Sequence, residues 1–233
     1  EYLESTYFEI GNYQNFHAVM DDYEKLCLTY GKDENKMVYY YLYSLEHIFT
    51  KHHDESIEAA KKSLKYAHLL QNDEFIIINY CNLAAQYRYK NEPENAHIAI
   101  KLAEYYKQKI PAVSATIVRG YLGALYYYAS TNSEMEFNQT KRDVLQHLEG
   151  KSPYYAGNIL FAEAILNYRA GYGNESLEMF EQAFILLVNQ QNYVLLSVLE
   201  RYLQRFGLKV QFRYKKELQH LIEKYKSEPI SVR

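Results

Sequence analysis

The sequence predicts an all-α protein made of about five helix hairpins that end in a C-terminal capping helix pair. Only 9 glycines and 4 prolines occur in 233 residues, too few for the many tight turns of a sandwich or barrel. Rows of 40 residues bring five polar turns into register, each followed by a helical pattern. The rows begin at Gly11, Lys51, Asn91, Thr131 and Gly171.

Each polar turn is also preceded by a helical pattern, so every row predicts one hairpin. Apolar residues at three- and four-residue spacing predict these first helices over 37–50, 74–90, 114–129 and 155–170. The chain therefore divides into a repeat array over 1–192, a capping pair over 193–226 and a tail over 227–233. Within the pair, the pattern around Gly207 predicts helices over 193–206 and 209–226, the second more charged, as the polar outer face of a terminal repeat requires.

Two positions of each second helix, seven residues apart, hold small side chains in rows two, three and five. Small residues there let paired helices approach closely. In row order the two positions are Phe16 and Tyr23, Ser56 and Ser63, Ala96 and Ala103, Glu136 and Asp143, and Ser176 and Ala183.

Capping residues and prolines predict where helices begin. The boundaries fall at Asp73, at Pro111 with Ser114, and at Ser152 with Pro153, because proline is tolerated in the first turn of a helix.

Composition narrows the class of function. With 26 basic and 29 acidic side chains the formal charge is −3. The chain therefore has no excess of positive charge with which to bind a polyanion such as nucleic acid. Cys27 and Cys81 lie within helical patterns, outside any C-x-x-C motif, and this favours buried thiols in a reducing, cytoplasmic compartment. No stretch predicts a membrane span, and no membrane partner is expected. A start at Glu1 within a helical pattern raises the expectation that the chain is a fragment.

No motif predicts catalysis, a cofactor or a metal site. His47, His52, His53 and Asp54 lack the spacing of a helical zinc site. Gly171 and Gly173 lack the third glycine and preceding strand of a nucleotide-binding loop. Neither cysteine has an evident histidine partner, so we expect a binding protein rather than an enzyme.

The hairpins resemble the tetratricopeptide (TPR) repeat. Row three carries the likeness with Leu83-Ala84, Tyr87, Ala96, Ile100 and Ala103; row five contributes Gly171, Ser176, Phe180 and Ala183, and row one Tyr7 and Gly11. The period is 40 residues instead of 34, and row four is degenerate. The resemblance implies a TPR-like right-handed superhelix whose first helices line the concave face.

The stretch KYAHLLQNDEFIIINYCNLAAQYRYKNEPENA is similar to the sensor domains of the Rgg, PlcR, NprR and Rap (RRNPP) group of quorum-sensing regulators of Gram-positive bacteria. That resemblance implies a cytoplasmic, homodimeric peptide sensor that acts in transcription regulation, with a helix-turn-helix DNA-binding domain upstream. It places the dimer contact in the later repeats and around Tyr214 to Tyr225. Regulators of this group hold the peptide backbone with an asparagine on an inner helix, and Asn82 matches it.

The helical register predicts which side chains face the concave groove. Apolar pockets would accept side chains of a short signalling peptide, asparagine would bind its backbone, and arginine would bind its carboxylate. A structural role in packing or in ion pairs is the alternative for each of these residues. The predicted peptide-binding residues are Tyr41, Leu45, Asn82, Arg88, Tyr121, Leu125, Tyr128, Asn158, Phe161, Arg169, Arg201 and Tyr202.

Two other functions stay open. A scaffold or co-chaperone would bind a partner's C-terminal tail, but such clamps use lysine, asparagine and arginine rather than a groove rich in tyrosine and leucine. A Rap-like protein would bind a response regulator through an N-terminal helical bundle, and no such segment precedes Tyr2 in this sequence.

Overall fold

The computed structural model describes residues 13–49, 52–112, 114–148, 154–189 and 193–227. These residues form eleven helices and no strand, which confirms the predicted all-α class. The chain divides into two compact units. The central unit runs from Met20 to Glu149, and the terminal unit holds the segment from Gly150 onward and the start of α2 (Tyr13–Tyr30). None of the described helices combines the length and apolar character that a bilayer crossing requires.

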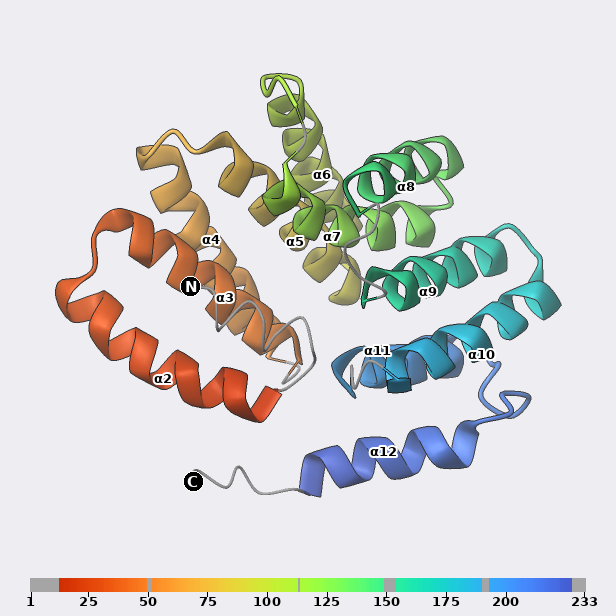
Figure 1. Cartoon of the computed structure of the whole chain (residues 1–233). Helices are drawn as coiled ribbons and strands as arrows, with labels where there is room; N and C mark the ends of the chain where they lie inside the picture. The colour runs from red at the N-terminus through yellow and green to blue at the C-terminus, as the bar shows by residue number, and fades with distance from the viewer. Residues whose placement is uncertain (1–12, 50–51, 113, 149–153, 190–192, 228–233) are drawn as a thin grey trace. The chain divides into compact units, whose positions relative to one another are not determined.

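The central unit contains three complete hairpins (Figure 1). The first helix of the first hairpin begins at Asp33, four residues before the predicted start. Its first turn contains Asp33 and Glu34, whose negative charges are favourable at the positive end of the helix dipole. Asn72 caps the second hairpin by accepting a hydrogen bond from the Phe75 amide at 3.1 Å, one residue before the boundary predicted at Asp73. The hairpins are α3 (Asp33–Phe49) with α4 (His53–Leu69), α5 (Asp73–Tyr89) with α6 (Pro93–Lys107), and α7 (Ala115–Thr131) with α8 (Glu134–Leu148).

The terminal unit contains α9 (Tyr154–Arg169) with α10 (Gly173–Asn189), and α11 (Tyr193–Arg205) with α12 (Lys215–Ser227). The prediction that the last helix begins at residue 209 is wrong, because residues 208–214 form turns. Buried Phe212 packs its ring edge-on against Phe184 of α10, with centroids 5.7 Å apart. The Arg213 amide donates to Glu181 Oε1 at 2.8 Å, so it is not available for a helical hydrogen bond. The α12 helix therefore starts six residues later.

The same turn closes successive hairpins, and this repetition is the strongest structural sign of the 40-residue period. After α5, α7 and α9 one residue adopts a left-handed conformation: Asn91 (φ 63°), Asn132 (φ 57°) and Gly171 (φ 97°). The next amide then bonds to the carbonyl five residues back in each case, which satisfies the free carbonyls of the helix end as a Schellman motif does. The residue pairs are Glu92 with Tyr87, Ser133 with Tyr128, and Tyr172 with Asn167, at 2.8–2.9 Å.

The predicted small residues of the second helices lie where the two helices of a hairpin contact each other. We call this line of contact between two helices the seam. Ser56 Oγ donates to the Ser44 carbonyl at 2.8 Å, and Ser176 Oγ donates to the Ala164 carbonyl at 2.7 Å. Each bond lies within one hairpin, and the two bonds occupy equivalent positions in hairpins that are three repeats apart in the sequence. All six small residues predicted for rows two, three and five are buried: Ser56, Ser63, Ala96, Ala103, Ser176 and Ala183.

Row four departs from the predicted register by one residue. The seam positions predicted there, Glu136 and Asp143, are exposed and half-buried, whereas Phe137 and Val144 are fully buried. The cause is the longer connection before α7, which spans residues 108–114, compared with 70–72 before α5. Because Phe137 and Val144 are bulkier than serine or alanine, α8 packs less closely on α7 than α4, α6 and α10 pack on their partners.

Two glycines on α7 allow it to lie directly on α5. A Cβ atom on Gly120 would stand 2.6–2.7 Å from atoms of Ile78, and one on Gly123 would stand 2.9 Å from the Cys81 carbonyl oxygen. Both distances are too short for real side chains. Helices α4 and α6 also pack on α5, so α5 is buried on nearly all sides, with ten of its seventeen residues in the core.

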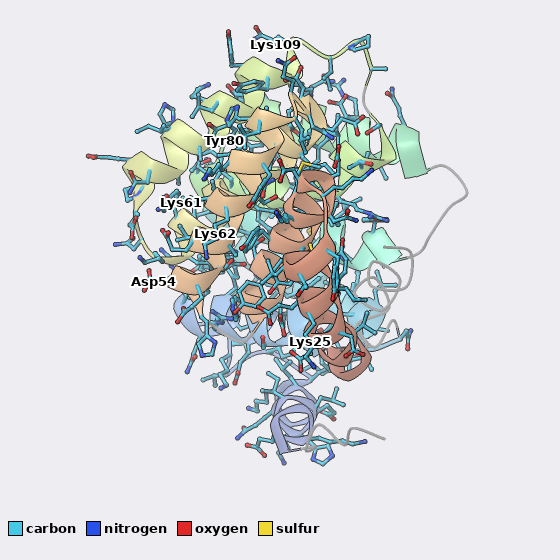
Figure 2. The ribbon with its side chains drawn as sticks, turned by 90° about the vertical axis from the view of Figure 1, so that its left-hand side faces the viewer. Lys25, Asp54, Lys61, Lys62, Tyr80 and Lys109 are labelled. Atoms are coloured by element: carbon cyan, nitrogen blue, oxygen red, sulfur yellow. The ribbon has the colours of Figure 1, made fainter. Side chains whose placement is uncertain are left out.

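Stacked rings account for much of the tyrosine content, 27 residues in all. Tyr80 stacks on Tyr106 with centroids 6.2 Å apart, and Lys109 Nζ lies 4.4 Å from the Tyr106 centroid. Lys62 Nζ lies 5.3 Å from the Tyr40 centroid. Figure 2 shows Lys62, Tyr80 and Lys109 on one side of the molecule. Ammonium groups over ring faces add cation–π attraction, so these tyrosines help to join the two helices of a hairpin.

Candidate functional site

The twelve predicted peptide-binding residues are divided between the two units. Seven lie in the central unit: Tyr41, Leu45, Asn82, Arg88, Tyr121, Leu125 and Tyr128. Five lie in the terminal unit: Asn158, Phe161, Arg169, Arg201 and Tyr202.

Several of these residues take part in packing in this conformation. Leu125 is fully enclosed, and Tyr41 and Leu45 are buried on α3, where the Tyr41 ring meets Phe75 edge-on. Arg88 Nε donates to Ser130 Oγ at 3.1 Å, which ties the end of α5 to the end of α7. Tyr41, Leu45 and Leu125 therefore present little surface to a ligand, and Arg88 is half-buried.

In the terminal unit the predicted aromatic residues belong to one cluster. The Phe161 ring is fully buried and lies edge-on to Tyr202, with centroids 5.6 Å apart. The exposed Arg169 places its guanidinium 5.5 Å from the Phe206 centroid. Asn158 is buried, and Arg201 is half-buried and already has interaction partners. This arrangement stabilises the packing of α9, α10 and α11.

Asn82 differs from the other asparagine in the core of α5. The Asn79 amide nitrogen donates to Ser63 Oγ at 3.0 Å and to the Phe75 carbonyl at 2.7 Å. The Asn82 amide nitrogen Nδ2 is buried and has no hydrogen-bond partner among the described residues. Its Oδ1 lies 3.2 Å from the position that a Cβ of Gly123 would occupy, so the amide sits at the seam of α5 and α7. An unpaired buried donor costs about 1–3 kcal/mol and marks a place where a carbonyl oxygen would be stabilised.

Tyr121 and Tyr128 line a cavity of about 440 Å³ between α6 and α8. Ile77 and Cys81 of α5 contribute to it, together with residues of the other three helices. The cavity follows from the register of row four, which holds α8 away from α7. Its remaining lining residues are Ile100, Ala103, Glu104, Lys107, Ala124, Met135, Glu136, Gln139, Thr140 and Arg142.

Two ion pairs hold Glu104 and Lys107, two of the charged side chains of this cavity. Glu104 Oε1 accepts a hydrogen bond from Tyr128 Oη at 2.7 Å, and its Oε2 accepts one from Lys101 Nζ at 2.7 Å. Lys107 Nζ lies 2.6 Å from Asp143 Oδ2 and 4.8 Å from the Tyr121 ring centroid. The ionised groups at the centre of the network are therefore already paired.

The Tyr121 hydroxyl is a buried polar group of the cavity that has no hydrogen-bond partner among the described residues. The residue is 3% exposed, and its Oη makes no hydrogen bond within the part of the chain that the structure describes. Burial raises the pKa of Tyr121 above its usual range, so the group stays protonated and can donate. Burial also raises the pKa of the Cys81 thiol to about 12, so that sulfur is an apolar surface rather than a nucleophile.

The sequence predicted two of these cavity residues, Tyr121 and Tyr128, but for a groove on the first helices. It did not predict Glu104, Lys107 or the residues of α8, because an assumed period of 40 put row four out of register. The glycine pair Gly120 and Gly123 was the available signal, since two glycines three apart within a helix mark a close approach to a neighbour.

The histidine cluster lies partly at a packing contact. His53 Nδ1 lies 3.1 Å from Gln86 Oε1, and its ring stacks on Tyr89, so it links α4 to α5. Over the described ranges, no three histidine, cysteine, aspartate or glutamate side chains are grouped as a metal site would require. Cys27 and Cys81 are both buried free thiols, as predicted.

Comparison with known proteins gives no assignment: neither a protein-family model, a curated protein nor a solved structure matches this chain.

Proposed function

We propose that the chain is a peptide-binding module, a TPR-like right-handed superhelix of helix hairpins that captures a short apolar peptide. The observation that supports it is the buried, unpartnered amide nitrogen of Asn82, the residue that the resemblance to peptide-responsive regulators also singles out. A peptide carbonyl would accept a hydrogen bond from this amide and remove the cost of leaving it unpaired.

Capture of the peptide would change the conformation of the module. The Asn82 amide is enclosed at the seam of α5 and α7, and a Cβ on Gly123 would already crowd it. A peptide could reach the amide only if this seam opens, and a ligand that prefers the opened arrangement shifts the population toward it. Through this shift between conformations, peptide binding would regulate the protein.

The wider role follows from the resemblance. We propose a cytoplasmic quorum-sensing transcription regulator in which this module is joined to a helix-turn-helix DNA-binding domain and pairs with a second copy. The module itself would bind and not catalyse, and DNA would be contacted only through the other domain.

The test starts from a synthetic library of random heptapeptides, with retained peptides identified by native mass spectrometry of the intact chain. The affinity of the selected peptide is then measured by fluorescence anisotropy. Asn82→Ala should weaken it by about 1–3 kcal/mol, or roughly fivefold to 150-fold, with little loss of stability.

Asn79→Ala is the matched control, because Asn79 lies one turn away on α5 and its amide nitrogen is fully bonded. That variant should lose stability and keep its peptide affinity once folded. Retention of no heptapeptide would contradict the proposal, and equal affinities for Asn82→Ala and the parent chain would remove Asn82 from the site.

A further inference from the structure

We infer that the cavity between α6 and α8 is a second binding site, which takes a small neutral molecule with an apolar body and a carbonyl oxygen. This inference does not depend on peptide binding, although Tyr121 and Tyr128 belong both to the predicted peptide-binding residues and to the lining of this cavity. The volume of the cavity, about 440 Å³, lies within the range of about 300–1,000 Å³ that small-molecule sites occupy.

The head group of the ligand is indicated by the unpartnered donor. Tyr121 is 97% buried, lines the cavity and leaves its hydroxyl without a protein acceptor among the described residues. Lys107 lines the cavity beside it and uses one of its three donors on Asp143. The hydroxyl oxygen is enclosed in this conformation, so a carbonyl oxygen would accept from it once the Tyr121 side chain turns toward the cavity. The carbonyl would then lie near the ammonium group.

The neutral character of the ligand follows from the charges. The cavity lining contains two acidic and two basic side chains, namely Glu104, Glu136, Lys107 and Arg142. Lys101 and Asp143, just outside the lining, pair with Glu104 and Lys107. Glu136 and Arg142 are exposed, so the enclosed part of the cavity beside Tyr121 contains only paired charges. A charged head group placed there would lose its hydration without gaining a free counter-ion, which is unfavourable in a buried site.

The apolar body of the ligand would contact Ile77 and Cys81 of α5, Ile100 and Ala103 of α6, and Ala124 of α7. All five are almost fully buried, and the Cys81 thiol stays protonated. Met135 of α8 is 79% exposed and also lines the cavity. Its flexible thioether suits a contact that adapts to the shape of a ligand.

The test uses hexanamide, hexanoate and hexylamine as probes of equal length that differ in head-group charge. Binding to the full chain is followed by NMR of ¹³C-labelled isoleucine and methionine methyl groups. Hexanamide should shift the methyl signals of Ile77, Ile100 and Met135 in a saturable way. The two charged probes should bind at least threefold more weakly.

Tyr121→Phe removes the hydroxyl and keeps the ring. It should weaken hexanamide binding about threefold to tenfold, while the unliganded variant should melt at the same or a higher temperature because it loses an unpaired buried group. Tyr127→Phe is the matched control: Tyr127 lies on the same helix, is similarly buried, and places its hydroxyl 3.4 Å from His97 Nδ1. Its affinity for hexanamide should stay unchanged.

Three results would overturn the inference. Absence of a saturable shift at these methyl groups would mean that the cavity holds solvent only. Equal affinities for Tyr121→Phe and the parent chain would exclude the hydroxyl as the head-group donor. Tighter binding of hexanoate or hexylamine than of hexanamide would contradict the neutral class. Failure of the heptapeptide selection would leave all three readouts interpretable, since none involves Asn82.

Discussion

Gly120 on α7 lies against Ile78 on α5 so closely that an added methyl group would stand 2.6 Å from Ile78 Cγ2 and 2.7 Å from its Cα. A flexible side chain could turn away from such a contact, but the Ile78 backbone cannot. The separation of α5 and α7 is therefore fixed by the lack of a side chain at this position.

Gly120→Ala should lower the free energy of unfolding by about 1–3 kcal/mol, the usual cost of overpacking a core, even though alanine is the better helix former. Urea unfolding followed by circular dichroism measures this. Gly173→Ala is the control, because a Cβ on Gly173 would meet no atom within 4 Å; this change should be neutral or stabilising. Equal stability of the two variants would contradict the tight seam.

The register of α8 can be tested with two adjacent residues. Phe137→Ala should destabilise the protein by about 3–5 kcal/mol, since Phe137 is fully buried and its loss leaves a cavity. Glu136→Ala should change stability by less than about 0.5 kcal/mol, because the side chain is exposed. Chemical denaturation of both variants gives the comparison. The reverse order would support the strict 40-residue register instead.

Much of the fold could be predicted from the sequence. The first helices were placed to within a few residues, because a strong apolar period and polar turns of nearly constant spacing define them. The small residues at the seams of rows two, three and five were identified for the same reason. Local patterns of this kind depend on neighbours in the chain.

The errors arose where contacts distant in sequence decide the structure. The start of α12 depends on Phe184 and Glu181 of α10, which hold Phe212 and Arg213 in turns. The groove residues Leu125 and Phe161 were placed by helical register, but their exposure depends on which helices cover them. The cavity could not be predicted, because it arises from side chains of four helices and from the displaced register of row four.

The stability of the protein should fall at alkaline pH. Burial raises the pKa of Cys81 to about 12 and raises the pKa of Cys27 as well. Burial and the hydrogen bond to Glu104 raise the pKa of Tyr128. In the unfolded chain a thiol loses its proton near pH 8.5 and a tyrosine near pH 10. Above these values the folded state binds more protons than the unfolded state, so the free energy of unfolding decreases as pH rises.

Urea unfolding between pH 7 and 11 should show a decline that begins near pH 8.5 and steepens above about pH 10. Replacing both cysteines by alanine should remove the first part of the decline and leave the second. A stability that stays constant from pH 8 to 11 would show that these groups titrate equally in both states. Ellman's reagent offers an independent check: the native protein should react slowly at pH 8, and both thiols should react at once in urea.

The one-residue shift of row four has a consequence for stoichiometry. An array of identical hairpins would offer the same surface at every junction, and a ligand would fill such a series in steps. Here the bulky Phe137 and Val144 replace the small seam residues of the neighbouring hairpins, and the space between α6 and α8 differs from the other junctions of the central unit. Titration of the full chain should therefore saturate at one small molecule per polypeptide, along a simple hyperbolic curve.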